Sequence, residues 1–387
     1  MTQKGFNLSA PISMRILMDV EERLSIVRQG LTEEIITEGE LHSMLSEKMH
    51  PVMYNGFEPS GLMHLGTGLA SVLEVNQLIK AGIESIMYIA DWFAYLNNKL
   101  GGDMEKIRMA GEYFIDGWKA CGIDAEHVKF VWTSKLMDDM EYWEMMLKIS
   151  KLVTINRVMR SVPIMGRTES EVKNPSMIIY PLMQATDVFM LNDRKGVDIC
   201  QLGMDQRKVN MLARDISKDL GRPAPVAIHH HLLLGLQQGG RMGGGFDENK
   251  NIDDEITFKM SKSKPDTAIF INNTEDEVNK KIGKAYCQQG DIKTNPILEI
   301  CRYVVFPKLG GLTIKRKEEY GGKLEFQSYQ ELEGAFAKGG IHPMDLKNAT
   351  AEALNEILDP IREYFEKNEK AHEHYEMAKK AAESVTR

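Results

Sequence analysis

The chain has 387 residues with a formal net charge of −8 at pH 7, and its 43% hydrophobic and 27% charged content fits a globular protein, not a disordered or fibrous one. Its length is typical of two or three packed domains. No run of about 18 apolar residues is present, and the first residues lack the apolar core of a signal peptide, so we expect no membrane span and a cytoplasmic location. The four cysteines are scattered without a Cys-x-x-Cys pair, which favours reduced thiols over disulfides or zinc.

In chain order, residues 1–48 are predicted to be helical, from the apolar spacing in 20–24 and 38–45. Short apolar runs then alternate with amphipathic stretches, a pattern that predicts a parallel sheet with right-handed crossovers. The predicted strands are 53–55, 86–91, 128–132 and 197–200. A mostly helical stretch at about 135–178 interrupts this alternation. Beyond about residue 295 the pattern is helical, apart from 312–315, and 351–380 is predicted to be one long amphipathic stretch.

We therefore expect an α/β fold: a Rossmann-like parallel-sheet catalytic domain with a helical insertion, followed by a mostly helical C-terminal domain. The expected parts are N-terminal helices in 1–48, the catalytic domain in 49–235 with its insertion at about 110–178, a mobile loop and lysine motif in 236–290, and the C-terminal domain in 291–387.

The first motif with chemical meaning is Gly56-Phe57-Glu58-Pro59-Ser60-Gly61-Leu62-Met63-His64-Leu65-Gly66-Thr67. It follows a short apolar run and precedes the amphipathic stretch 69–81, an order typical of the strand, loop and helix that bind nucleotides in α/β folds. Gly66 would let a ligand approach the backbone, and His64 could donate to a phosphate. A single histidine beside a loop is more often only a satisfied polar group.

The second motif, Lys259-Met260-Ser261-Lys262-Ser263, lies about 195 residues downstream. It follows a glycine-rich segment that contains Gly239, Gly240, Gly243, Gly244 and Gly245. A mobile loop of this kind can bring two ammonium groups onto a polyphosphate. A Lys/Ser run alone is equally typical of a solvated loop, but its occurrence together with the first motif favours phosphate binding.

A third segment, Tyr180 to Asp187, places Tyr180, Gln184 and Asp187 at spacings of four and three, which puts them on one face of a helix. The polar set Gly203-Met204-Asp205-Gln206-Arg207-Lys208 follows the last predicted strand. Without the two flanking motifs, a polar stripe on an ordinary helix would be the better interpretation.

With these motifs the chain resembles the class I aminoacyl-tRNA synthetases, whose signatures are a His-Ile-Gly-His-type motif and Lys-Met-Ser-Lys-Ser. The first signature here reads His64-Leu65-Gly66-Thr67, so its second histidine is replaced. The third segment, Tyr54 and the C-terminal His342-Pro343-Met344-Asp345-Leu346-Lys347-Asn348 are most similar to tyrosyl-tRNA synthetases of the archaeal and eukaryotic kind. The similarity extends from about residue 18 to about residue 367.

The resemblance implies roles for the matching residues. Tyr54 and Asp187 would meet the phenolic hydroxyl of tyrosine, and Tyr180, Gln184 and Gln206 its ammonium group. His64, Lys259 and Lys262 would be catalytic. The implied ATP-binding residues are Gly56, Gly66, Thr67, Gly203, Asp205, Met260, Ser261 and Ser263. Relatives carry histidine where this chain has Phe93, a departure at the floor of the tyrosine pocket.

The implied reaction activates tyrosine with ATP and Mg²⁺, releases pyrophosphate, and transfers the tyrosyl group to the 3′ end of tRNA(Tyr). No protein nucleophile is needed, so catalysis rests on positioning and charge stabilisation. The resemblance also implies that Arg160 and Arg207 read the first acceptor base pair, that His342 and Asp345 contact the first anticodon base, and that the protein is a homodimer. The net charge disfavours RNA binding overall, so local basic patches are expected.

Three alternatives stay open at this point. A tryptophanyl-tRNA synthetase would share the scaffold, although Tyr54 with Asp187 favours a phenol over an indole. An RNA-binding protein without activation activity would not need the lysines and His64. A different nucleotidyl transferase would not need the segment 342–348. A metal site at His229-His230-His231 is disfavoured, because neighbouring residues on a strand point to opposite faces.

Overall fold

The fold is built around a six-stranded sheet. The computed structural model describes residues 18–237, 247–262 and 264–385. The strand order is β1-β6-β5-β2-β3-β4, in which β1 runs antiparallel to β6 and the other neighbours are parallel. The bounds are β1 Thr32–Ile36, β2 Val52–Phe57, β3 Glu84–Ile89, β4 Val128–Trp132, β5 Val197–Gly203 and β6 Val226–His230. The four predicted strands and their parallel pairing are confirmed.

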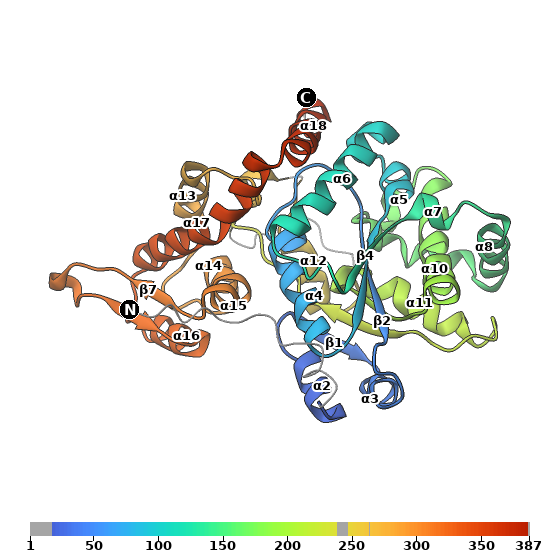
Figure 1. The fold of residues 1–387 in the computed structure, drawn as a ribbon, viewed down its shortest axis with the longest axis horizontal. Coiled ribbons are helices and arrows are strands. Elements are labelled where there is room, and N and C mark those ends of the chain that lie inside the picture. The colour runs from blue at the N-terminus through green and yellow to red at the C-terminus, as the bar shows by residue number, and fades with distance from the viewer. Residues whose placement is uncertain (1–17, 238–246, 263, 386–387) are drawn as a thin grey trace.

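Helices cover both faces of the sheet (Figure 1). Side chains alternate along a strand, so Met53 and Met87 lie in the core with α4 and α6, whereas Tyr54 and Tyr88 lie in the opposite core with α10 and α11. The bounds of these helices are α4 Ser71–Lys80, α6 Met104–Ala120, α10 Ser176–Lys195 and α11 Arg207–Ser217. The tyrosine face of the sheet thus belongs to the core that contains the predicted substrate helix.

Shorter helices surround this layer. They are α2 Val20–Val27, α3 Glu38–Glu47, α5 Asp91–Leu96, α7 Thr133–Leu136, α8 Met140–Leu152, α9 Ile155–Met159 and α12 Lys250–Phe258. Local sequence sets several of their ends: Asp19 with Glu22 and Thr37 with Glu40 form capping boxes at α2 and α3. Among the described residues, no helix is long and apolar enough to cross a membrane.

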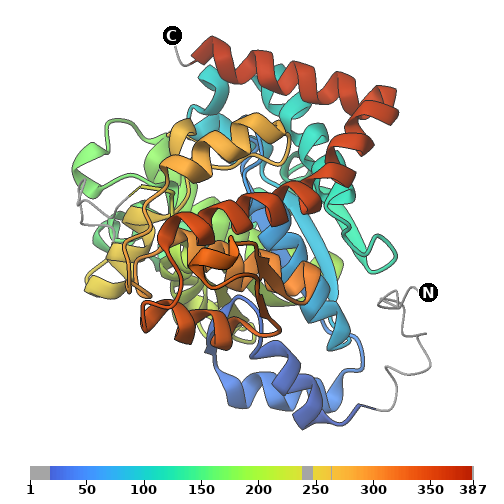
Figure 2. The same cartoon turned by 90° about the vertical axis from the view of Figure 1, so that its left-hand side faces the viewer.

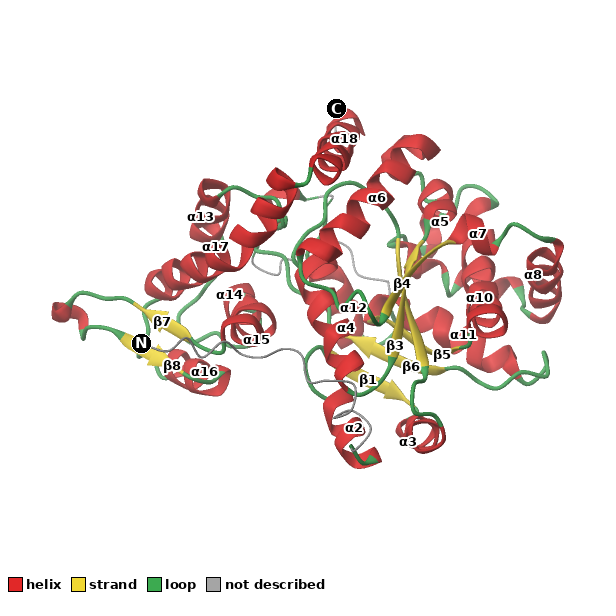
Figure 3. Cartoon of the chain, viewed as in Figure 1, coloured by secondary structure: helices red, strands yellow, loops and turns green. Residues whose placement is uncertain are grey.

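The C-terminal part is mostly helical, as predicted, and lies to one side of the sheet (Figure 3). It contains α13 Glu275–Lys284, α14 Pro296–Ile300, α15 Phe306–Leu309, α16 Tyr329–Ala337, α17 Pro343–Lys367, α18 Glu369–Val385 and the antiparallel pair β7 Leu312–Ile314 and β8 Leu324–Phe326. The last helix, α18, returns to pack along α6 (Figures 1 and 2).

Three expectations need correction. The range 1–48 is not wholly helical, because β1 lies within it and pairs with the edge of the sheet. The range 110–178 contains the end of α6 and the sheet strand β4, so only its later part interrupts the alternation. The long C-terminal stretch is two helices, α17 and α18, which separate at Asn368. The glycine-rich segment 239–245 lies outside the described residues.

Candidate active site

A cavity of about 1010 Å³ opens at the carboxyl ends of β2 and β5, where the strand order reverses. This is the place where open α/β sheets bind ligands. The predicted catalytic, nucleotide and tyrosine residues that line it are Tyr54, Gly56, His64, Gly66, Thr67, Tyr180, Gln184, Asp187, Gly203, Asp205, Gln206, Lys259, Met260, Ser261 and Lys262. Ser263 lies outside the described residues. Segments from four parts of the sequence therefore meet in one space.

Backbone pairing brings the two signature motifs together. The N–H of Leu65 donates to the carbonyl of Ile269 at 2.9 Å, and the N–H of Ile271 donates to the carbonyl of Met63 at 3.0 Å. Met260 likewise donates its N–H to the carbonyl of Leu233, at 2.6 Å, in the segment after β6. The lysine motif and the segment that follows it are thus tied to the histidine motif and to the sheet.

His64 is buried, neutral and oriented by the backbone. Its Nδ1 accepts from the N–H of Gly66 at 3.1 Å and from that of Thr67 at 3.4 Å. Burial, followed by the nearby charges of Lys262 and Lys259, lowers the pKa of His64 to about 3. A neutral imidazole that accepts at Nδ1 carries its proton on Nε2. The ring is therefore a hydrogen-bond donor that does not titrate near neutral pH.

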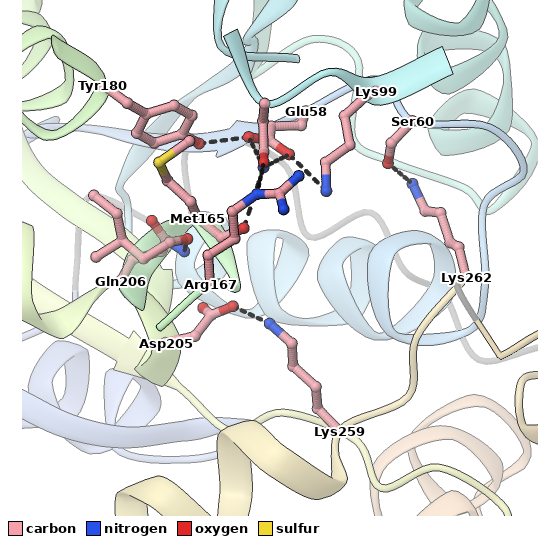
Figure 4. A network of polar contacts seen from close by, with 12 residues as sticks. Glu58, Ser60, Lys99, Met165, Arg167, Tyr180, Asp205, Gln206, Lys259 and Lys262 are labelled. Carbon is pink, nitrogen blue, oxygen red and sulfur yellow. Dashed lines mark hydrogen bonds and ion pairs between the residues drawn. The ribbon is translucent and has the colours of Figure 1, made fainter. Parts of the chain in front are cut away.

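Glycines make room for the groups beside them. A Cβ at Gly66 would lie 3.1 Å from the ring of His64. A Cβ at Gly203 would lie 2.7 Å from Oδ1 of Asp205, closer than real Cβ contacts, so a larger residue would displace the carboxylate. Asp205 in turn forms an ion pair with Lys259 (Figure 4). The first lysine of the motif is thus anchored to the loop after β5.

Lys262 reaches Ser60 in the loop after β2, whereas Lys259 reaches Asp205 (Figure 4). Its ammonium donates to Oγ of Ser60 at 2.9 Å and lies 4.3 Å from the ring centre of Phe114. Burial lowers the pKa of Lys262 to about 7, and the charge of Lys99 adds to this effect. A cation held in this way gains much from an anionic ligand, because the ligand would supply the countercharge.

The other end of the cavity is suited to a phenol. Asp187 of α10 accepts from the hydroxyl of Tyr142 at 2.7 Å, and burial raises the pKa of Asp187 to about 8. The hydroxyl of Tyr54 and Oε1 of Gln184 are buried, and in the described part of the chain the first has only the thiol of Cys200, a weak partner, beside it and the second has no hydrogen-bond partner. Unpaired buried polar atoms cost free energy, so this end fits a ligand that brings its own donors and acceptors.

The three predicted ammonium-binding residues line the same cavity. Gln184 donates to Oε1 of Gln206 at 3.1 Å, and Gln206 donates to the carbonyl of Ile164 at 2.9 Å. Tyr180 is buried, and the ring of Phe93 packs edge-on against it with 4.8 Å between ring centres. Phe93, which the resemblance marks as a departure, therefore supports α10 by packing.

Sequence reasoning missed a polar network around Glu58 (Figure 4). The Glu58 carboxylate accepts from the hydroxyl of Tyr180 at 2.6 Å and from Nδ2 of Asn97 at 3.1 Å, and Nζ of Lys99 lies 3.4 Å away. Oδ1 of Asn97 accepts from Nε of Arg167 at 3.2 Å. The position of Glu58 directly after a strand was a usable signal. No motif predicts that Asn97 and Arg167 approach it.

The predicted tRNA-binding residues do not line this cavity. Arg160 is exposed at the end of α9, and Arg207 begins α11 and pairs with Glu34 at 2.9 Å. His342 caps α17 by accepting from the N–H of Met344 at 3.2 Å, and Asp345 lies in the first turn of that helix. Arg160 and Arg207 thus lie in the part of the chain that contains the sheet, and His342 and Asp345 lie in the C-terminal part.

Comparison with known proteins gives one consistent result. The family model described as tRNA synthetases class I (W and Y) matches residues 46–359. Tyrosine–tRNA ligase 1, cytoplasmic, of Arabidopsis thaliana is 43% identical over 91% of this chain and 87% of its own length. The tyrosine–tRNA ligase of Saccharolobus solfataricus is 42% identical over 96% of this chain and 100% of its own.

Solved structures agree. The tyrosyl-tRNA synthetase of Pyrococcus horikoshii, solved with L-tyrosine, aligns with a TM-score of 0.83 at 38% identity over 93% of this chain and 100% of that one. The tryptophanyl-tRNA synthetase of Aeropyrum pernix K1 has a TM-score of 0.64 at 17% identity, over 96% of this chain and 91% of that one, and so shares the fold alone. The chain belongs to the class I tRNA synthetases of the W and Y group and, within it, to the tyrosyl-tRNA synthetases.

Proposed function

We propose that the protein is a tyrosine–tRNA ligase that activates tyrosine with ATP and transfers the tyrosyl group to the 3′ end of tRNA(Tyr). One observation carries this proposal: a single cavity has a buried carboxyl and an unpaired phenol at one end and a neutral histidine with two lysines at the other. The first end suits the side chain of tyrosine and the second suits a polyphosphate.

At the amino-acid end, Tyr54 and Asp187 are proposed to pair with the substrate hydroxyl. Phenylalanine would fill the same space but leave these buried groups unpaired, and this penalty is the source of selectivity. Tyr180, Gln184 and Gln206 are proposed to surround the ammonium group, with the carboxylate of Glu58 behind Tyr180. This assignment places the substrate carboxylate toward the lysines.

At the phosphate end, an oxygen of the tyrosine carboxylate attacks the α-phosphorus of ATP, and the bond to pyrophosphate breaks. Negative charge on the phosphate oxygens is then stabilised by Nε2–H of His64 and by the ammonium groups of Lys259 and Lys262. Gly56, Gly66 and Thr67 are proposed to lie beside the nucleotide, as are Gly203, Asp205, Met260 and Ser261. In the second step a hydroxyl of the terminal adenosine attacks the tyrosyl carbonyl, and AMP leaves.

Magnesium fits this site as an ion carried mainly by the substrate. No group of three or more histidine, cysteine or acidic side chains that could hold a metal is present among the described residues. Mg²⁺ in nucleotide sites commonly keeps several waters and takes few protein ligands. When bound, it would neutralise charge on the pyrophosphate; the cavity carboxylates Glu58 and Asp205 could accept from its water ligands only beside their present partners, Tyr180, Asn97 and Lys99 for Glu58 and Lys259 for Asp205.

We also propose which parts of the chain carry which function and which residues contact tRNA. Residues 49–235 are proposed to be the catalytic part and 291–387 the part that reads the anticodon through His342 and Asp345. Arg160 and Arg207 would contact the acceptor stem, and Arg207 would have to exchange its partner Glu34 for RNA. The relative named cytoplasmic supports a cytoplasmic location.

The exposed apolar face of α8 supports a homodimer. Met140, Trp143 and Leu147 follow each other at helical spacing and are 71%, 42% and 64% exposed. A contiguous apolar helix face of this kind marks an interface more often than a free surface.

The test is ATP–pyrophosphate exchange with tyrosine, tryptophan or phenylalanine, without tRNA. Exchange with tyrosine alone is the expected result. Exchange with tryptophan would favour the rival synthetase, and no exchange with any of them would overturn the proposal in favour of an inactive RNA-binding scaffold.

A further inference from the structure

The last helix of the chain forms part of the active-site wall. Helix α18 lies beyond residue 359, where the family match ends, yet Lys379, Ala382 and Glu383 line the same cavity as the signature motifs. These three residues are spaced by three and four, so they share one face of the helix. Lys380, the next residue along, is exposed and does not line the cavity.

Specific contacts fix α18 against α6 (Figures 1 and 2). His374 is buried and its Nδ1 lies 2.7 Å from Oδ2 of Asp116. The ring of Tyr375 lies 5.9 Å from that of Tyr113, whose hydroxyl accepts from the N–H of Met63, next to His64. These contacts therefore fix the position of α18 relative to α6, the helix whose Tyr113 supports the histidine motif.

The same face of α18 also packs against the loop of Ser60 and Gly61, which contacts Lys262. A Cβ at Gly61 would lie 3.3 Å from Cβ of Ala382, and Gly61 has φ +111°, a conformation that favours glycine. The preceding residue, Ser60, accepts the ammonium of Lys262. Lys379, one turn before Ala382, thus lies on the wall behind the phosphate end of the cavity and not behind the tyrosine end.

We propose that Lys379 is a further substrate-binding residue, whose ammonium binds a phosphate group of the substrate from the α18 side. The inference rests on the proposed function. The position next to the Ser60–Gly61 loop favours the polyphosphate of ATP, and a phosphate at the tRNA 3′ end offers the same chemistry. Lys379 is partly buried, and its Nζ lies 5.8 Å from the ring centre of Tyr375, one turn earlier on the same helix.

The two charged residues on this wall predict opposite effects on phosphate binding. Glu383 stands one turn after Lys379 and lines the cavity too, so its carboxylate adds negative charge to the wall that carries Lys379. Removing the lysine charge should weaken phosphate binding, and removing the glutamate charge should strengthen it. A merely structural helix would not produce effects of opposite sign.

The experiment compares Lys379→Met, which keeps the apolar stem, with Lys379→Arg, Lys380→Met and Glu383→Gln in the full-length protein. Exchange gives KM for ATP and aminoacylation gives KM for tRNA. We expect Lys379→Met to raise one KM by about three- to tenfold, the range between an exposed ion pair and a hydrogen bond to a charged group. Lys379→Arg should restore that KM, and Glu383→Gln should lower it.

A raised KM for ATP assigns Lys379 to the nucleotide, and a raised KM for tRNA alone assigns it to the tRNA 3′ end. A finding that Lys379→Met and Lys380→Met have the same KM for ATP and the same KM for tRNA would overturn the inference. So would a lowered unfolding temperature with a lower kcat and both KM values unchanged, because that result indicates a packing role. Absence of exchange in the unmodified protein would instead overturn the proposed function.

Discussion

At the scale of single residues, Tyr54 couples ligand binding to stability. Its buried hydroxyl has only the thiol of Cys200, a weak partner, beside it in the described part of the chain, so Tyr54→Phe should raise the free energy of unfolding by about 1 kcal/mol and raise KM for tyrosine about tenfold. Exchange assays and chemical denaturation measure the two effects. Selectivity against phenylalanine should fall in the same variant.

Tyr113→Phe is the matched control, since the Tyr113 hydroxyl donates to Asn272 at 2.6 Å and accepts from Met63. The same chemical change should there lower the free energy of unfolding by about 1 kcal/mol. If Tyr54→Phe destabilised the protein as much as Tyr113→Phe, the hydroxyl of Tyr54 would have a structural role and not the proposed binding role.

Lys262 predicts a pH dependence with a defined sign. Burial holds its pKa at about 7, so the ammonium is present below that pH and is lost as pH rises through it. If this cation binds phosphate, kcat/KM for ATP in exchange should fall about tenfold per pH unit above the pKa. His64, with a pKa of about 3, would not contribute to this change.

Two variants test that assignment. Lys262→Arg keeps its charge at all these pH values, so it should remove the fall up to about pH 9. Lys99→Met removes the charge that, after burial, lowers the pKa of Lys262 and should move the fall to higher pH. A flat profile from about pH 6 to about pH 9 in the unmodified protein would contradict the role of Lys262.

At the scale of elements, α14 connects the C-terminal part to the lysine motif. Glu299 of α14 accepts from the N–H of Leu234 at 2.8 Å and lies 3.0 Å from Nε2 of His231, which lines the cavity. Leu234 in turn pairs with Lys259 through an isolated bridge. A carboxylate outside the sheet thus fixes the segment that positions the first lysine.

Glu299→Ala should therefore lower kcat in exchange about tenfold, as expected when a hydrogen bond to a charged group is lost, with KM for tyrosine unchanged. Glu299→Gln keeps an acceptor for Leu234 and should retain most activity. A rise in KM for tyrosine equal to the loss in kcat would show that the contact supports the whole site and not the lysine motif.

The same scale explains what the sequence could predict. The strands β2 to β5 were found because each is a short, mostly apolar run; β2, β3 and β5 lie inside the sheet, whereas β4 is an edge strand that is only partly buried. β1 was missed because Thr-Glu-Glu-Ile-Ile is an edge strand with acidic residues, one of which, Glu34, pairs with Arg207. The break at Asn368 was missed because no glycine or proline marks it; its local signal is Asn368 itself, whose Oδ1 accepts from the N–H of Ala371 at 3.1 Å and so caps the start of α18.

Some residues of the site could be predicted from the sequence and others could not. Motif residues could be placed together because the two signature motifs and the segment Tyr180 to Asp187 resemble those of the tyrosyl-tRNA synthetases, in which the matching residues form one site. Tyr142 could not, because its hydroxyl reaches Asp187 from α8, and only the packing of α8 on α10 brings the two together. The approach of Asn97 to Glu58 and of Lys379 to the cavity depends in the same way on tertiary contacts that carry no local signal.

At the scale of the whole molecule, α8 predicts the oligomeric state. Stable interfaces bury about 800 Å² per partner and have an apolar centre. Met140, Trp143 and Leu147 provide such a centre on an outer edge of the catalytic part (Figure 1), and Leu152 and Ile155 extend it, at 41% and 73% exposed. The protein is therefore expected to sediment as a dimer.

The double substitution Met140→Glu with Leu147→Glu should convert that dimer to a monomer, because two carboxylates per protomer would have to be buried without partners. Sedimentation velocity over a range of concentrations measures this. Met49→Glu is the control, since Met49 is 57% exposed on another surface and its substitution should leave the dimer intact. A monomer before any substitution would rule out this face as an interface. Dissociation by Met49→Glu as well would mean that added negative charge alone, on a chain already at −8, separates the protomers.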